Sequence, residues 1–496
     1  MLQNLEVIEL LKGIPFEQLI RDLFLYSTKE PWFFTEFSFL FIFGIFVFFY
    51  ALLFDWNSIR KCYLVAFSLF FYYKSSGPFL ALFITQVTFD YIFAHWIQKK
   101  EGLPKKLIGL VAILFSLSFL LYFKYANFFI ENTNTLLLTH VEFVDLFLPI
   151  GISFYTFQSI SYLVDVYRGE IKASTNFLDY AFYMTFFPHL VAGPIVRASD
   201  FLGQVNHPTR PTALVFKESF VRIILGLIKK LFIADYLAKY VDMVFASPSF
   251  YSGGENLLGV IAYTFQIYFD FSGYSDIAIG LALLVGYRLK ENFENPYNAT
   301  NITVFWRKWH ISLSSWLRDY VYIPLGGNRK GEFNTYLFLL ITMLIGGFWH
   351  GASWKFVFWG FAHGIALGAH KLIKNKLPDH FIINGLGWLC TFTFVSFCWI
   401  FFRANDFNAA IEILQRIGYH TQWIDFKGFW FSRFELSLLL LSVFVIVLFP
   451  VNWKKWSVER LYYIPSFFWI FFLFIALQLI IQFRDEVVQP FIYFQF

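Results

Sequence analysis

Apolar segments long enough to cross a lipid bilayer recur along this chain, and they constrain its fold more than any other feature of the sequence. A helix needs about 20 mainly apolar residues to cross roughly 30 Å of hydrocarbon. The 496 residues include 71 phenylalanines, and 58% of the chain is hydrophobic while only 15% is charged. Because a backbone in lipid must satisfy its hydrogen bonds internally, we predict an all-α, polytopic integral membrane protein with about 10–12 membrane segments.

Two of the expected segments differ from regular membrane helices. Residues 177–190 run into Pro188, and a second proline follows at position 194, which predicts a broken or re-entrant element. Residues 298–330 hold five Lys or Arg and one acid, so we expect them to lie along the membrane or to dip into it from the cytoplasmic side. The other predicted segments are 33–54, 62–73, 78–97, 107–130, 146–166, 219–245, 256–285, 336–348, 354–373, 383–402, 436–449 and 467–481.

The loops indicate a single integral membrane domain, residues 1–496, with no soluble domain and no internal repeat. Residues 98–106 hold four lysines and one acid, which predicts that this loop is cytoplasmic and that the N-terminus is outside. An amphipathic pattern within residues 1–30 predicts a short helix in the membrane interface. Residues 401–496 are expected to add C-terminal helices.

The charges and the cysteines exclude several kinds of site. The net charge is +5, but the basic residues are spread over short loops, so we interpret them as topology signals and expect no nucleic-acid partner. Cys62, Cys390 and Cys398 lie in apolar segments and lack the spacing of a metal site or a disulfide framework. We therefore expect neither a bound metal ion nor a bound cofactor.

His310 is the first candidate catalytic residue. It lies in residues 305–319, a stretch rich in Trp and Ser inside an otherwise apolar sequence. Helical spacing places it on one face with Arg307 and Ser314, while Trp309 belongs to a neighbouring aromatic stripe.

His350 is the second candidate catalytic residue, and it lies between two apolar runs. Gly347 and Gly351 on either side are expected to leave room for a substrate, and Trp349 is expected to line a narrow passage. Burial disfavours a charged imidazole. Both candidate histidines should therefore be neutral near pH 7 and able to act as a general base.

Four other polar residues in apolar segments need an explanation. If one helix continues from His350, a separation of 13 residues at about 100° each turns His363 roughly 140° away. His363 and His370 then face away from His350 and are expected to be structural. Acids within a membrane helix are expensive, so Asp270 and Asp276 either pair with a buried partner or orient the site.

Motifs around these residues extend over most of the chain. They run Leu-Pro-Ile-Gly-Ile-Ser-Phe at 148–154, Pro-His-Leu-Val-Ala-Gly-Pro at 188–194, and Gly-Gly-Phe-Trp-His-Gly at 346–351, together with residues 270–276 and 292–327. With these motifs the chain resembles the membrane-bound O-acyltransferase family, in particular the branch that O-acetylates bacterial polysaccharides such as alginate. The resemblance covers most of residues 30–400 in family order and is less distinctive over the last 90 residues.

The resemblance implies a ring of helices around a central tunnel that joins a cytoplasmic donor side to an outer acceptor side. It carries the family's catalytic histidine, in a Trp-His-Gly motif, onto His350, and an upstream histidine, in a Trp-His-Ile-Ser-Leu motif, onto His310. It also implies a multi-pass protein of the bacterial plasma (inner) membrane, an acetyl group, a polysaccharide acceptor, and a periplasmic acyltransferase partner that completes the transfer.

We therefore predict an O-acyltransferase that moves an acyl group from a cytoplasmic thioester to a hydroxyl of an envelope glycan. The donor, such as acetyl-CoA, is a cosubstrate whose phosphates cannot cross hydrocarbon. Two alternatives stay open: a transporter or flippase, although such proteins often show paired repeats, and a non-catalytic scaffold for envelope-modifying enzymes. The basic residues expected to border the donor entrance are Arg307, Lys308, Arg318, Arg329 and Lys330.

Overall fold

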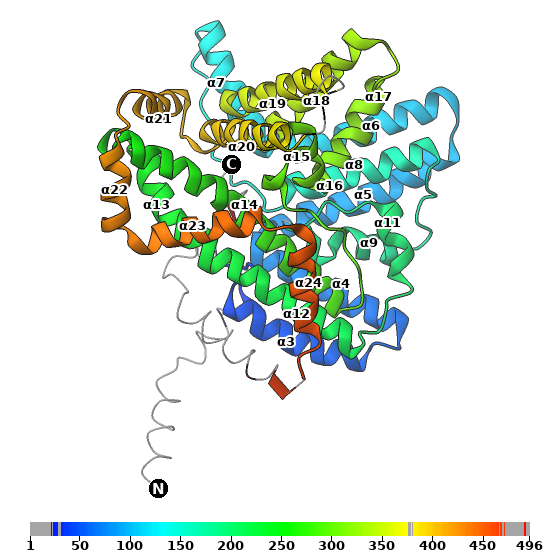
Figure 1. The fold of residues 1–496 in the computed structure, drawn as a ribbon. Coiled ribbons are helices and arrows are strands. Elements are labelled where there is room, and N and C mark those ends of the chain that lie inside the picture. Colours follow the sequence, from blue (N-terminus) through cyan, green and yellow to red (C-terminus); the bar gives the residue numbers. More distant parts are fainter. Residues whose placement is uncertain are drawn as a thin grey trace. The chain divides into compact units, whose positions relative to one another are not determined.

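Helices make up the regular structure of this protein. The computed structural model describes residues 21, 23–27, 31–191, 193–374, 378, 380–465, 467, 468, 471, 491 and 492. Within these residues no strand occurs, which confirms the predicted all-α class (Figure 1). The interfacial helix expected within residues 1–30 and the segment expected at 467–481 fall largely outside the described residues.

Six of the described helices are long and apolar enough to cross a membrane, or up to seven if a bent pair counts as one span. The prediction of about 10–12 segments also included shorter ones, such as α3 (Phe37–Leu52), which has only 16 residues. The protein is a multi-pass membrane protein. The six candidate spans are Asn57–Lys99, Gly102–Leu137, Gly253–Leu284, Glu332–His350, Trp354–Ile373 and Phe381–Arg403.

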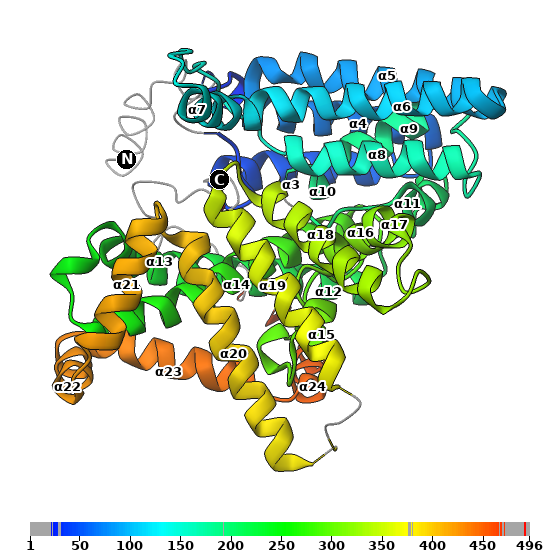
Figure 2. The ribbon, with the colours of Figure 1, turned by 90° about the horizontal axis from the view of Figure 1, so that it is seen from above.

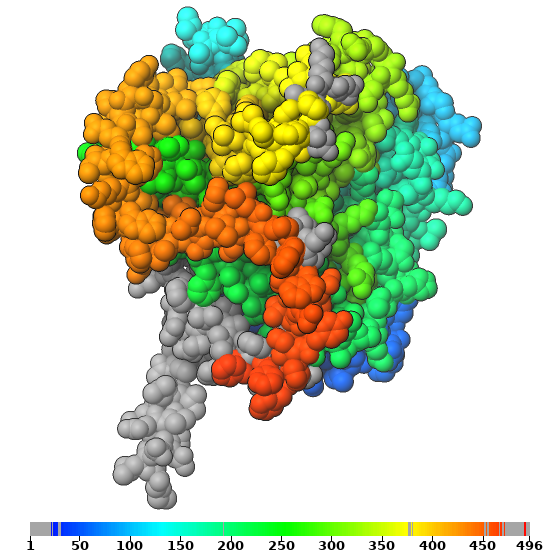
Figure 3. All heavy atoms as spheres, viewed as in Figure 1, coloured from blue at the N-terminus to red at the C-terminus, as the bar shows by residue number. Residues whose placement is uncertain are grey.

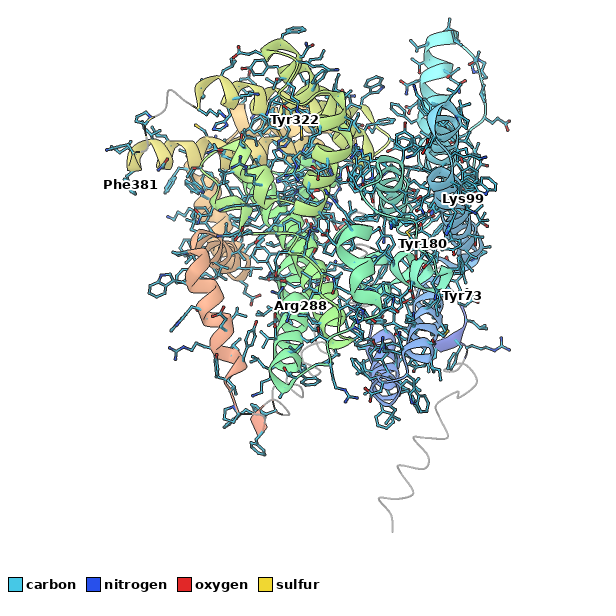
Figure 4. The ribbon with its side chains drawn as sticks, turned by 90° about the vertical axis from the view of Figure 1, so that its right-hand side faces the viewer. Tyr73, Lys99, Tyr180, Arg288, Tyr322 and Phe381 are labelled. Carbon is cyan, nitrogen blue, oxygen red and sulfur yellow. The ribbon has the colours of Figure 1, made fainter. Side chains whose placement is uncertain are left out.

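The described residues within 1–116, 148–191 and 198–208 form one compact unit. In it α5 (Leu80–Lys99) runs beside α8 (Ile152–Arg168), as Figure 2 shows. A buried polar cluster joins them, because Gln86 Nε2 lies 2.8 Å from Asp90 Oδ1 and 3.0 Å from Ser159 Oγ. The hydroxyl of Tyr180, labelled in Figure 4, donates to Asp90 Oδ2 at 3.2 Å. The other helices here are α3, α4 (Asn57–Ser76), η1 (Gly77–Phe79), most of α6 (Gly102–Leu120), α9 (Phe177–Thr185), α10 (Phe187–Leu190) and α11 (Ala198–Val205).

The prediction of a broken element at residues 177–190 is confirmed. α9 ends before Phe186, whose ψ of 104° leaves the helical region, and α10 is a single turn with Pro188 among its first residues. Proline is well suited to this position, since its missing N–H would have no helical partner there.

The described residues within 117–147, 192–197 and 209–496 form the second compact unit, which is organised around the buried helix α14 (Gly253–Leu284). A capping box fixes the start of α14: the Glu255 N–H donates to Ser252 Oγ, and the Ser252 N–H donates to the Glu255 carboxylate. Of the most apolar 18 residues of α14, 89% are buried, so protein and not lipid surrounds this helix. The other elements are η2 (Leu121–Tyr125), α7 (Ala126–Leu137), α12 (Ala213–Leu227), η3 (Ile228–Ala234), α13 (Asp235–Ala246), η4 (Pro248–Phe250), η5 (Pro296–Asn298), α15 (Ile302–Lys308), α16 (Ile311–Leu317), η6 (Arg318–Tyr322), α17 (Ile323–Leu325), α18 (Glu332–His350), α19 (Trp354–Ile373), α20 (Phe381–Arg403), α21 (Phe407–Tyr419), α22 (Trp423–Ser432), α23 (Phe434–Leu448) and α24 (Val451–Tyr462).

Glycines let α12 approach α14 closely. A Cβ atom added at Gly226 would lie 2.6 Å from the carbonyl oxygen of Gly273, and one added at Gly280 would lie 2.8 Å from that of Ser219. Small residues at such contacts allow two helix backbones to pack tightly where lipid supplies no hydrophobic driving force.

The same device joins α18 to α19, and it corrects one prediction. A Cβ atom at Gly347 would collide with the carbonyl oxygen of Phe356, and one at Gly360 would collide with that of Met343. A Cβ atom at Gly351 would meet the ring of Phe356. The expectation that glycines beside His350 leave room for a substrate is therefore wrong, because α19 fills that space.

The outer surface of the second unit carries large apolar side chains. On α23 the residues Leu441 and Val445 are each 52% exposed, as expected for side chains that face lipid. Figure 3 shows the spheres of α23 and α24 in orange and red on the face in view.

Candidate active site

His310 lies at a break between two short helices, not on one continuous helix. α15 ends at Lys308, α16 begins at Ile311, and His310 has φ of 43°, in the left-handed region. The prediction that Arg307, His310 and Ser314 share one helical face is therefore wrong. The expectation that residues 298–330 are not an ordinary span agrees with the short helices found there.

Asn292 holds His310 in place, and the sequence analysis missed this role. Its side-chain oxygen accepts hydrogen bonds from the Ser312 N–H at 3.3 Å and from Ser312 Oγ at 2.9 Å, which identifies that atom as the oxygen. The same oxygen lies 3.2 Å from His310 Nδ1. The proton of a neutral His310 is therefore on Nδ1, and Nε2 carries the lone pair.

The environment of His310 favours the neutral imidazole. The side chain is fully buried, and the ring of Phe271 meets it edge-on at 4.6 Å between centroids. Burial lowers the pKa of His310 from its ordinary value to about 3. A neutral imidazole with a lone pair at Nε2 has the form that a general base requires.

His350 is the last residue of α18, and aromatic rings surround it. The centroid of its ring lies 5.0 Å from that of Trp349, 5.1 Å from that of Trp359 and 5.2 Å from that of Phe402. Only 4% of the residue is exposed, so the imidazole is shielded from solvent.

Trp349 brings the two candidate histidines together. The centroid of its indole lies 6.3 Å from that of His310 and 5.0 Å from that of His350, and the two imidazoles are close enough to interact electrostatically. Two histidines 40 positions apart in the sequence thus both lie against the ring of Trp349.

His363 also belongs to this site, which corrects the prediction that it faces away from His350. α18 ends at His350 and a separate helix, α19, begins at Trp354, so the assumption of one continuous helix fails. The ring of Trp359 lies between the two, 5.1 Å from His350 and 4.6 Å from His363. His363 is fully buried and accepts a hydrogen bond from Trp306 Nε1 at 3.3 Å.

A cavity of about 490 Å³ lies beside α15 and α16, within the range typical of ligand pockets. We call it the basic pocket, because four cations line it. Its apolar wall comes mainly from α18, α19 and the end of α16. The lining residues are Thr303, Trp306, Arg307, Ile311, Ser314, Ser315, Leu317, Arg318, Tyr322, Asn328, Leu339, Thr342, Met343, Leu367, His370, Lys371 and Lys374.

The basic pocket contains some of the predicted donor-binding residues and lacks others. Of the residues expected at the donor entrance, Arg307 and Arg318 line this pocket, whereas Lys308, Arg329 and Lys330 are not among its lining residues; Ser314 lines it as well. Lys371, Lys374 and His370, which the sequence analysis did not assign to the donor, line it instead.

Hydrogen bonds fix several groups around the pocket. Lys371 Nζ and the hydroxyl of Tyr322, labelled in Figure 4, both donate to Asn328 Oδ1, at 2.8 and 2.7 Å. Asp319 forms ion pairs with Arg318 and Arg197, each at 2.6 Å. Burial raises the pKa of Asp319, but the hydrogen bonds from the two guanidinium groups outweigh burial and lower the pKa below its ordinary value.

Trp306 connects the basic pocket to the histidines. Its indole lines the pocket, and its ring centroid lies 5.6 Å from that of Trp359, which in turn contacts His350. We call Trp306 and Trp359 the aromatic wall. A charged, open cavity on one side of this wall thus adjoins a buried, aromatic site on the other.

The remaining candidates have structural neighbours. Trp309 is buried and stacks on Phe305 with centroids 5.5 Å apart. Asp270 pairs with Lys230 at 2.6 Å, and Asp276 pairs with Lys229. Of the two readings left open for these acids, the ion pairs favour pairing, and neither acid lines the basic pocket.

The chain is similar to several known proteins. The profile of the membrane-bound O-acyltransferase family matches residues 168–407, which include His310 and His350. A probable alginate O-acetylase AlgI of Pseudomonas putida is 43% identical over 403 residues, 78% of this chain and 80% of that protein. A peptidoglycan O-acetyltransferase of Helicobacter pylori is 38% identical over 385 residues, 72% of this chain and 73% of that protein. A teichoic acid D-alanyltransferase of Bacillus subtilis is 28% identical over 276 residues, 52% of this chain and 69% of that protein.

Proposed function

Because the chain belongs to the membrane-bound O-acyltransferase family and is an acyltransferase, we propose that it transfers an acetyl group to a polysaccharide hydroxyl. The donor is a cytoplasmic thioester such as acetyl-CoA, and the acceptor lies across the plasma membrane. Relatives named as alginate and peptidoglycan O-acetyltransferases support the acetyl group and the glycan acceptor.

The basic pocket is the proposed donor site. The side chains of Arg307, Arg318, Lys371 and Lys374 bring four positive charges to one cavity, and guanidinium and ammonium groups are the usual partners of phosphate. Two sequence segments that follow pocket-lining residues, 326–331 and 374–376, are rich in basic residues, which supports a cytoplasmic position.

His350 is the proposed general base, and His310 orients the substrate or shares the proton. The acceptor oxygen attacks the thioester carbon while His350 takes its proton, so that a C–O bond forms. The C–S bond then breaks, and the proton passes to the departing thiolate. A thiol has a pKa of about 8.5, so the thiolate leaves with little help from an acid.

One observation carries this proposal: the aromatic wall separates a four-cation pocket from two buried histidines. A transferase with a polar donor needs both environments. Phosphates need charged partners, and a histidine base needs a site that disfavours its charged form.

The test uses the full chain reconstituted in lipid vesicles, with radiolabelled acetyl-CoA outside and an alginate oligosaccharide as acceptor. We expect free CoA and acetylated oligosaccharide in equal amounts. Oligosaccharide that crosses the membrane unmodified would support the flippase alternative. No turnover until a periplasmic acyltransferase is added would show that the partner completes the transfer, and no turnover even then would support the scaffold alternative.

A further inference from the structure

Lys124 is a charged residue inside one of the most apolar parts of the chain. It lies in the candidate span Gly102–Leu137, whose most apolar 18 residues have a mean hydropathy of 2.2. An ammonium group at membrane depth is costly, and such residues usually face a partner or a functional site. The proposed reaction does not yet account for Lys124.

The contacts of Lys124 lead directly to His350. Lys124 Nζ donates hydrogen bonds to the carbonyl oxygens of Trp349 and His350, at 2.8 and 2.9 Å. The neighbouring hydroxyl of Tyr125 donates to the carbonyl oxygen of Phe348 at 2.8 Å. Two adjacent residues of η2 thus bind three consecutive carbonyl groups at the end of α18. η2 is a π-helical turn, a type that often occurs at functional sites.

These carbonyl groups end a helix, and their position affects the imidazole. The last carbonyl groups of a helix have no partner within it and carry the negative end of the helix dipole. A histidine at this end is stabilised in its charged form, which cannot accept a proton. The positive charge of Lys124 on the same carbonyl groups opposes this effect. The titratable groups that face His350 are Lys124 on η2, His310 before α16 and His363 on α19.

We propose that Lys124 is a positioning residue for acyl transfer: it binds the carbonyl groups that end α18, fixes the backbone of His350, and keeps its imidazole in the neutral form that accepts a proton. This inference rests on the proposed function, because it requires His350 to be the base. The bonds made and broken in the reaction are unchanged. Lys124 affects only how readily His350 takes the acceptor's proton.

The main test compares Lys124→Met, which removes the charge, with Lys124→Arg, which retains it. With saturating acetyl-CoA and oligosaccharide, we expect the acid side of the kcat–pH profile of Lys124→Met to lie about one pH unit higher than that of the wild type, with the donor KM unchanged. The rates of the two proteins should converge as the pH rises, because His350 then loses its proton in both. Lys124→Arg should stay within about threefold of the wild type at every pH.

Two further variants separate charge from helix capping. Lys124→Gln keeps a donor for the α18 carbonyl groups but has no charge, so it should reproduce the pH-dependent loss even if Lys124→Met does not fold. Tyr125→Phe removes only the neighbouring hydrogen bond to Phe348 and should keep kcat within about threefold.

The result that would overturn the inference is a loss that is equal at all pH values and parallels the loss in melting temperature, or no loss at all. Lys124 would then be a structural cap only. Measuring His350→Gln in the same assay distinguishes a wrong inference about Lys124 from a wrong proposed function. If His350→Gln is inactive, the base assignment stands and the inference about Lys124 alone is wrong. If His350→Gln is active, or the wild type transfers no acetyl group, both are wrong.

Discussion

Replacing His350 tests the mechanism most directly, and the choice of substitution follows from its surroundings. Three aromatic centroids lie within 5.2 Å of its ring, so His350→Ala would leave a void among them. A void of roughly 60 Å³ at about 24 cal/mol per Å³ destabilises the fold by about 1.5 kcal/mol, before the lost contacts are counted. Glutamine is close to histidine in size, so His350→Gln limits this damage while it removes the base.

The expected loss of rate is larger than the packing effect can produce. General-base catalysis is typically worth about 10²–10⁴ in rate, which corresponds to about 3–5 kcal/mol in the activation barrier. We expect His350→Gln to lower kcat by at least 100-fold, with a melting temperature within a few degrees of the wild type and a donor KM that changes little.

The assay measures CoA release and oligosaccharide acetylation by purified, monodisperse protein with both substrates saturating. His189→Gln is a matched control, because it replaces a buried histidine, 2% exposed, that donates to or accepts from Gln158 at 3.1 Å in the other compact unit. Its kcat should fall less than about threefold. Near-normal turnover by well-folded His350→Gln would refute the mechanism and move the base to His310 or to the partner protein.

Three further predictions address the donor, the packing and the pH. Arg307→Gln should raise the KM for acetyl-CoA about 5- to 10-fold and leave kcat unchanged, because it removes a phosphate contact that is equally strong in the ground state and the transition state. An unchanged KM would argue against the basic pocket as the donor site. Gly347→Ala should lower the melting temperature, because the added Cβ atom collides with the carbonyl oxygen of Phe356. Gly385→Ala is the control and should not lower it, because a Cβ atom added there has no neighbouring atom within 4 Å. Equal melting temperatures for the two variants would contradict the packing of α18 against α19. Burial holds the pKa of His310, which lies outside the candidate spans, at about 3, below its ordinary value of about 6.5. The unfolded chain therefore binds a proton that the folded chain does not, and stability should fall from pH 7 to pH 5, less so in His310→Gln; parallel pH curves would contradict this shift.

The sequence was sufficient to find the two histidines, because an imidazole inside an apolar segment is costly to bury and can be recognised without a structure. His310 and His350 each interrupt apolar sequence, and few roles other than chemistry explain such residues. The structure places both against Trp349. Local signals also sufficed for the broken helix at residues 177–190, since proline acts on its own neighbours.

The break at His310 was not predictable from local sequence. Histidine has no strong preference for a positive φ, and nothing in residues 305–319 signals the end of a helix. The break is fixed by Asn292, whose backbone carbonyl accepts from the Ile311 N–H at 2.9 Å and whose side chain binds Ser312. These contacts come from a loop about 20 positions earlier, and an argument from helical spacing considers only neighbours three or four positions apart.

Lys371 and Lys374 could have been found by a simple argument. α18 and α19 have 19 and 20 residues and are joined by a short turn, so the end of α19 must return to the start of α18. That start adjoins the loop after Arg318, already assigned to the donor. Residues 336–348 and 354–373 were predicted as separate segments, but the assumption that one helix continues from His350 hid this geometry and placed His363 on the wrong side.

The aromatic wall follows from two requirements of the proposed reaction that conflict within a single cavity. Phosphate groups bind well only beside cations, and cations hold water, while a neutral histidine base is favoured by low polarity. Trp306 and Trp359 separate these environments. Their ring centroids lie 5.6 Å apart, and the centroid of Trp359 lies 5.1 Å from that of His350. A donor fits both sides only if a narrow, uncharged arm joins its phosphates to its thioester. The arm of acetyl-CoA has this form, so a variant that enlarges the passage, such as Trp306→Leu, should let water reach His350 and raise hydrolysis of acetyl-CoA relative to transfer.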